Sequence, residues 1–278
     1  MADIGHWKPI RDTHAIQMAA IGITFSEDIS SRPWDRARII AAQKAQQLGL
    51  ESENKHATIQ FVIGSGGPMP SPQPSNVPAG VDHLHMERPD FFSDKFTVSR
   101  RGLRYEEWSY TRWAALLEKA STAMEEAFAL YADTVMSSIY VDYVDVFQAE
   151  QPDSENWDCG EVIDRTSDLI APAAFDRSNP WHTYSGHFET ISPDVRRLHQ
   201  VNVDLGDIPG SSVPGRAIQI RTIITDQMNL PVLSPFLPEK QTWPVVQEHL
   251  NALHRTANAT VKRVLTAAAA SAISLRVE

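Results

Sequence analysis

The stretch that decides the fold is HAIQMAAIGITF, at residues 14–25. Its apolar side chains would lie on both faces of an extended chain, which is typical of a central strand that is covered on two sides. A helix is predicted directly after it, because Ser30 or Ser31 can cap an N-terminus, Pro33 suits a first turn, and Gly49 ends the apolar periodicity. A strand followed by a helix therefore opens the chain.

The next segments extend this unit. Clean alternation predicts a half-buried strand at residues 57–63, and a further strand is predicted at residues 91–105. Residues 64–80 between them are rich in Pro, Ser and Gly and predict a mobile loop. An apolar stripe at helical spacing follows at residues 113–131, and a strand rich in Val, Ile and Tyr at residues 135–147. The order strand, helix, strand, strand, helix, strand predicts a ferredoxin-like β-α-β-β-α-β unit.

The second half of the chain predicts an antiparallel sheet and a helix. Strands are expected at residues 181–191, 197–207 and 216–228, and a long C-terminal helix is expected after Thr242. An acidic, proline-containing stretch at residues 149–158 marks the predicted boundary. We therefore expect an α+β protein with a ferredoxin-like unit at residues 1–150 and a sheet with a helix at residues 151–278, packed together as one compact molecule.

Composition restricts the setting and the partners. The 278 residues carry a formal net charge of −10, and such a field repels phosphate, which disfavours nucleic acid as a partner. The chain has one cysteine, Cys159, so no internal disulfide can form, and a reducing, cytoplasmic location is expected. Residues 1–7 carry no secretory signal pattern, and the most apolar window, residues 265–275, is too short to span a membrane.

The side chains that could carry chemistry do not combine into a motif. His182 and His187 have opposite parity on a predicted strand and so would face opposite sides of a sheet. Asp142 and Asp145 are also of opposite parity, which predicts a solvated or helix-facing position for each. Acidic neighbours raise the pKa of the Cys159 thiol. We therefore predict no catalytic residue, no metal and no cofactor.

Two groups of residues are candidates for binding. Arginines interleaved with aromatic side chains can hold an anionic ligand or anchor a protein partner. The alternative is that these arginines pair with surplus carboxylates and the aromatic rings join the core. The first group is Arg100, Arg101, Arg104, Tyr105, Trp108 and Arg112. The second group, Trp181, Tyr184 and His199, is predicted to line a pocket between the sheet and the C-terminal helix.

Several linked motifs carry a resemblance. They are VSRRGLRYEEWSYTRW, WHTYSGHF, RRLHQVNVDL, RAIQIRTIITDQM and LNALHRTANATVKRVL. Over most of its length the chain resembles a sporadically distributed family of uncharacterised prokaryotic α+β proteins. The resemblance implies a bacterial setting and an accessory role such as defence against phage, and it supplies no catalytic residue. The predicted unit also resembles repeat-associated proteins that bind or cleave guide RNA in bacterial immunity. The chain departs from these in its acidic charge and in lacking a glycine-rich loop near its C-terminal end.

Three functional hypotheses follow. The first is a non-enzymatic binding or assembly protein in a bacterial complex, with the region from Arg100 to Trp113 as its contact surface for another protein or another copy. The second is an RNA-binding or RNA-processing subunit, in which His14 or His56 could be a general base. The third is a small-ligand-binding protein with a pocket between the sheet and the C-terminal helix.

Overall fold

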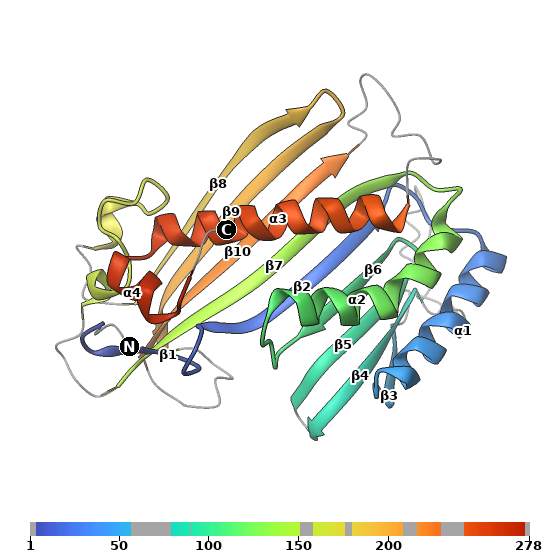
Figure 1. Cartoon of the computed structure of the whole chain (residues 1–278), viewed down its shortest axis with the longest axis horizontal. Coiled ribbons are helices and arrows are strands. Elements are labelled where there is room, and N and C mark those ends of the chain that lie inside the picture. The colour runs from blue at the N-terminus through green and yellow to red at the C-terminus, as the bar shows by residue number, and fades with distance from the viewer. Residues whose placement is uncertain are drawn as a thin grey trace, which may run out of the picture.

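The computed structural model describes residues 4–56, 79–89, 91–150, 158–175, 180–207, 216–228 and 242–275. In this part of the chain ten strands form one antiparallel sheet, and α1 to α3 cross one of its faces (Figure 1). The strands are β1 (Trp7–Pro9), β2 (Ile16–Phe25), β3 (Ser52–His56), β4 (Gly80–Arg88), β5 (Phe91–Ser99), β6 (Gly102–Glu107), β7 (Met136–Ala149), β8 (Trp181–Ser192), β9 (Val195–Asp207) and β10 (Arg216–Met228). The helices are α1 (Ser31–Gln47), α2 (Trp113–Phe128), α3 (Trp243–Val264) and α4 (Ala267–Ala272), with 3-10 turns η1 (Ala129–Tyr131), η2 (Cys159–Glu161) and η3 (Pro172–Ala174).

The strand order is β3-β4-β5-β6-β2-β7-β10-β9-β8, with β1 added beside β7. The predicted α+β class and the long C-terminal helix on the sheet are confirmed. β2 lies at the centre between β6 and β7, as its sequence indicates. On the face away from the helices Gly22 lies under the ring of Tyr140, and a Cβ on Gly22 would lie 2.1 Å from Tyr140 Cζ. The small residue is therefore needed for this packing.

Two predicted segments differ from the structure. Residues 91–105 form a hairpin of β5 and β6 instead of one strand. The turn is stabilised by Ser99, whose hydroxyl accepts from the Arg101 amide and donates to the Gly102 carbonyl. Residues 80–88, for which no strand was predicted, form β4, so His83 and His85 lie on a strand. The predicted strand at residues 57–63 and residues 64–78 of the predicted loop lie outside the described residues.

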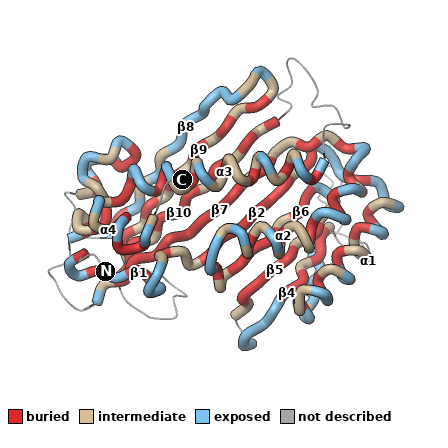
Figure 2. Tube along the Cα trace, in the orientation of Figure 1, coloured by how far each residue is buried: buried red, intermediate tan, exposed pale blue. Residues whose placement is uncertain are grey.

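Two apolar clusters separate the sheet from the helices. One joins α1, α2 and the first half of α3 to the sheet, and the other lies under the second half of α3, α4 and residues 159–174. Figure 2 shows the buried residues running along the central strands, while much of β8 is exposed. The sheet is continuous across the predicted boundary, because β7 pairs with β10 from Gln148↔Ala217 to Ser138↔Gln227.

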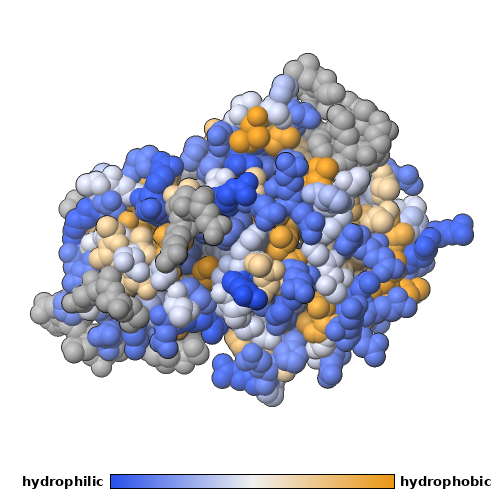
Figure 3. Space-filling model, viewed as in Figure 1, coloured by the Kyte–Doolittle hydropathy of each residue, from blue (hydrophilic) through white to orange (hydrophobic). Residues whose placement is uncertain are grey.

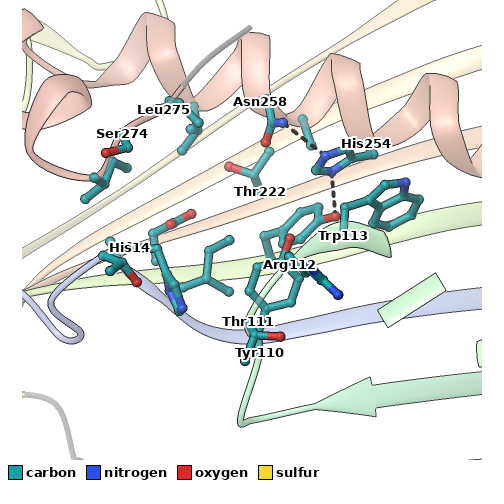
Figure 4. Close-up of a pocket in the computed structure, with 18 residues that line it drawn as sticks. His14, Tyr110, Thr111, Arg112, Trp113, Thr222, His254, Asn258, Ser274 and Leu275 are labelled. Carbon is teal, nitrogen blue, oxygen red and sulfur yellow. Dashed lines mark hydrogen bonds between the residues drawn. The ribbon is translucent and has the colours of Figure 1, made fainter. Parts of the chain in front are cut away.

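α3 ends at Val264, where the helix is interrupted before the chain enters α4. Leu265 is extended and forms an isolated bridge with Ile163, and the Thr266 hydroxyl then accepts a hydrogen bond from the Ala269 amide. The chain therefore turns into the short helix α4, whose C-terminal end leads to Ser274 and Leu275 beside α3 (Figure 4).

Within the described ranges no helix has the length and apolar character needed to cross a membrane.

Candidate functional site

A cavity of about 340 Å³ lies between α3 and the central strands. Its walls come from six segments: the start of β2, the loop before α2, β7, β10, α3 and the turn after α4. In Figure 4, His254 and Asn258 descend from α3, while His14 and Tyr110 come from the strand side. The surrounding face of the molecule is mostly hydrophilic, with apolar side chains in separated patches (Figure 3). The lining of the cavity itself combines apolar and polar side chains, as is usual in ligand-binding sites.

Asp145 is the acidic residue of the cavity lining. It lies on β7 between Ile16 of β2 and Ile220 of β10, on the face that α3 covers. Its exposed fraction is 4%, and within the described ranges no residue donates a hydrogen bond to its carboxylate or forms an ion pair with it. Burial therefore raises the pKa of Asp145 to about 7. The carboxyl group changes charge near neutral pH.

His254 is held by three neighbours. Its ring stacks on Trp113 with the ring centres 4.4 Å apart and the planes inclined by 3°. Its Nδ1 lies 2.9 Å from the Tyr143 hydroxyl and its Nε2 lies 3.2 Å from Asn258 Nδ2 (Figure 4). Burial, with a smaller effect of Arg255, lowers the pKa of His254 to about 4, so the ring is neutral at pH 7. If the Asn258 amide donates to Nε2, Nδ1–H donates to Tyr143, and the Tyr143 hydroxyl hydrogen is left for another acceptor.

The remaining wall combines aromatic rings with isolated polar groups. Tyr110 makes edge contacts with His14 at 5.7 Å and with Tyr143 at 6.2 Å. Burial and then Arg11 lower the pKa of His14. Thr222 is fully buried, and its hydroxyl has no hydrogen-bond partner among the residues that the structure describes. A ligand could supply the bond that this hydroxyl lacks.

Arg112 lies at the exposed rim of the same cavity. Throughout the described part of the chain its guanidinium has no ion pair and no side-chain hydrogen bond. The rim therefore offers an unpaired cation, and the interior offers an unpaired carboxyl group. No group of three or more His, Cys, Asp and Glu side chains suited to a metal ion is found in the described ranges.

Comparison with known proteins does not identify a family for the chain. No protein-family model matches the chain, and no match is found among the curated proteins or among the solved structures.

The arginines predicted as one contact surface are mostly engaged within the molecule. Arg100 donates to the Ile29 carbonyl and lies over the ring of Trp34. Arg101 donates to the Ser26 carbonyl and lies 3.5 Å from the Asp28 carboxylate. Arg104 bonds to Glu106, Tyr140 and Asp142 on the face away from the helices. Of the four predicted arginines, Arg112 is the one that lines the cavity.

The predicted aromatic residues are also distributed over both faces. Tyr105 is buried under the helices and donates to Asp94, whereas Trp108 donates to Glu106 on the other face. Trp181 and His199 are buried on the helix side, but Tyr184 lies on the opposite side and is 56% exposed. None of the residues Trp181, Tyr184 and His199 lines the cavity described here, although a cavity between sheet and C-terminal helix is present.

The two histidines predicted as general bases lie apart. His14 lines the cavity, whereas His56 is on β3 and bonds to Asp82 at 2.8 Å. The opposite orientation of Asp142 and Asp145 is confirmed. The predicted solvated or helix-facing position is wrong for Asp142, which is 1% exposed and is held by Arg104 and Arg221 on the face away from α3. Asp145 was not selected as a site residue. The sequence could have indicated it, because Asp145 is a carboxylate in the strongly apolar strand YVDYVDVF, at a position that alternation places on the face covered by the helices.

Proposed function

We propose that this protein binds a small organic molecule in the cavity between α3 and the sheet. The observation that carries the proposal is the Asp145 carboxyl group, which is buried at the cavity wall without a partner in the described part of the chain. A buried, unpaired carboxyl group destabilises a fold, and such groups are concentrated at functional sites. The unbonded Thr222 hydroxyl on the same wall supports the proposal.

The test is a thermal-shift screen of the purified protein with fragments that include cations, anions, zwitterions and neutral compounds. A ligand at a hundred times its Kd should stabilise the protein by about 2.7 kcal/mol. The gain should fall in Asp145→Asn and in Thr222→Val, which keep the side-chain shape. Glu118→Gln, on the exposed side of α2, is the matched control. Hits that stabilise all four proteins equally, or a screen without hits, would contradict the proposal.

A second candidate, association with another protein, is favoured by β8. This strand is at the end of the sheet, and in the described residues it pairs with β9 alone. Tyr184, Phe188 and Ile191 on it are 56%, 53% and 42% exposed. A long edge strand with exposed apolar side chains is a template for strand pairing.

Light scattering and pulldown can test this candidate. Phe188→Lys combined with Ile191→Lys should abolish self-association or partner capture while the melting temperature stays nearly constant. Ile39→Lys, which replaces an exposed apolar residue of α1, is the control. Association that survives the β8 substitutions would exclude this edge.

We further propose that the elements β2, α1, β5, β6, α2 and β7 are a ferredoxin-like unit with the β3–β4 pair inserted after α1. The sheet order β5-β6-β2-β7 and the position of α1 and α2 on one face support this. An experimental structure of the chain tests it, and a different order of these four strands would contradict it.

A further inference from the structure

The charge requirement of Asp145 restricts the ligand of the proposed function. When Asp145 is ionised, its carboxylate needs a hydrogen-bond donor, and a cationic donor would also neutralise its charge. Among the residues that the structure describes, none is hydrogen-bonded to this carboxylate or forms an ion pair with it. A protonated amine on the ligand meets both needs, because it carries positive charge and several N–H groups.

The walls around Asp145 suit a cation. The cavity is lined by the aromatic rings of Tyr110, Trp113 and Tyr143, and the faces of such rings attract positive charge. Burial lowers the pKa values of His14 and His254, so neither ring repels an ammonium group at pH 7. The protein as a whole carries a net charge of −10, which favours the approach of cations.

The rim of the cavity adds the opposite charge. Arg112 lies there without an ion pair among the described residues. A guanidinium presents a planar set of donors that fits a carboxylate or a phosphate better than an ammonium group does. A ligand that spans the cavity from Asp145 to Arg112 would therefore place its basic nitrogen inside and an anionic group at the rim.

Resting on the ligand-binding function proposed above, we infer that the ligand is a small zwitterion of the amino-acid type. Its ammonium group binds the Asp145 carboxylate, its apolar or aromatic body lies against Tyr110 and Tyr143, and its anionic group binds Arg112. This assigns Asp145 and Arg112 as the residues that determine specificity.

The pairing has a pH signature. Asp145 has a pKa of about 7 in the free protein, so its carboxyl group is ionised in about a tenth of the molecules at pH 6 and in about nine tenths at pH 8. Since the ammonium group binds the ionised form, affinity should rise about tenfold between these pH values, and binding at pH 7 should release about half a proton per ligand. The other titratable and charged groups of the lining are His14, Tyr110, Arg112, Tyr143 and His254. The tyrosine pKa values are raised and the histidine values lowered, so Asp145 dominates this interval.

The experiment is isothermal titration calorimetry with three matched probe sets. Each set has one body, indole, phenyl or branched alkyl, and contains the amino acid, the amine without the carboxylate and the acid without the amine. We expect at least one set in which the amino acid binds most tightly, the amine less tightly and the acid at least tenfold more weakly than the amine. Asp145→Asn should weaken the amino acid and the amine at least tenfold and remove the pH dependence. Arg112→Gln should reduce the amino acid to the affinity of the amine.

The outcomes separate this inference from the function on which it rests. If the acid binds as tightly as the amine in every set, or if no probe of any set binds, the zwitterion inference is wrong. The ligand-binding function is wrong as well only if the neutral and anionic fragments of the wider screen also fail to bind in the cavity. Glu118→Gln should behave as the wild type throughout, which excludes a general effect of lost negative charge.

Discussion

Replacing Asp145 by Asn should stabilise the protein at alkaline pH. The difference between the pKa of about 7 and the ordinary value of 3.8 corresponds to about 4 kcal/mol at about 1.36 kcal/mol per pKa unit. The folded protein holds this proton more tightly than the unfolded chain does. The penalty of ionising Asp145 is therefore small at about pH 4, grows as the pH rises, and is complete above about pH 7.

Urea denaturation of both proteins at pH 5 and pH 8 measures this penalty. The free energy of unfolding of Asp145→Asn relative to the wild type should rise by about 3 kcal/mol between these pH values. A pH-independent loss of about 1 kcal/mol from an unsatisfied amide would leave that change unaffected. Other titrating groups are common to both proteins and cancel. Parallel pH profiles for the two proteins would refute the assignment of a buried, unpaired carboxyl group.

Asp142→Asn is the matched control, because Asp142 lies on the same strand but accepts bonds from Arg104 and Arg221. Its replacement removes the carboxylate partner of Arg221 and one of the two carboxylate partners of Arg104, the other being Glu106, and should destabilise the protein at pH 5 and at pH 8. Stabilisation by this substitution at pH 8 would mean that the two carboxyl groups do not differ in the way their contacts indicate.

Three further predictions concern other parts of the fold. Burial alone would raise the pKa of Asp226, but hydrogen bonds from His249 and Arg197 lower it, so its contribution to stability is present above about pH 4 and is lost as the pH falls. Asp226→Ala should lower the free energy of unfolding, measured by urea denaturation, by about 3 to 5 kcal/mol. A loss below about 1 kcal/mol would contradict this. Burial, with a smaller effect of Asp158, raises the pKa of the Cys159 thiol from 9.0 to about 11. Its reaction with a thiol reagent at pH 8 should therefore be about a hundredfold slower in the native protein than in the unfolded protein. Equal rates would be inconsistent with the burial of this thiol. Gly22→Ala should destabilise by about 1 to 3 kcal/mol; in the background of Tyr140→Ala, which removes the contacting ring, this loss should shrink, and full additivity would disprove the contact.

Much of the architecture follows from periodicity in the sequence. The apolar run at residues 14–25 gave a central strand, and the stripes at residues 113–131 and after Thr242 gave α2 and α3, because long amphipathic segments have a strong helical period. The β5–β6 hairpin was missed because Arg100 and Arg101, the two residues between its strands, are not typical turn residues; the turn is stabilised by Ser99 side-chain hydrogen bonds, and Gly102 follows it. β4 was missed because His83 and other polar residues obscure its alternation.

The site was less predictable than the fold. The sequence indicated a pocket between the sheet and the C-terminal helix, and it indicated the opposite orientation of Asp142 and Asp145. It could not show which carboxyl group finds arginines, since Arg104 and Arg221 reach Asp142 from other strands of the sheet. Nor could it show that Arg112 lines the cavity while Arg100, Arg101 and Arg104 bond within the molecule. Both facts depend on pairing between segments far apart in the chain.

The most direct test of ligand binding at Asp145 is a ¹³C NMR titration of its carboxyl group in the free protein, assigned by comparison with Asp145→Asn. We predict a pKa of about 7 for this group, and a marked fall of this pKa when an amine-bearing ligand is bound. A pKa close to the ordinary value of 3.8 in the free protein would mean that the carboxyl group is solvated or already paired, and the observation on which the proposed function rests would be lost.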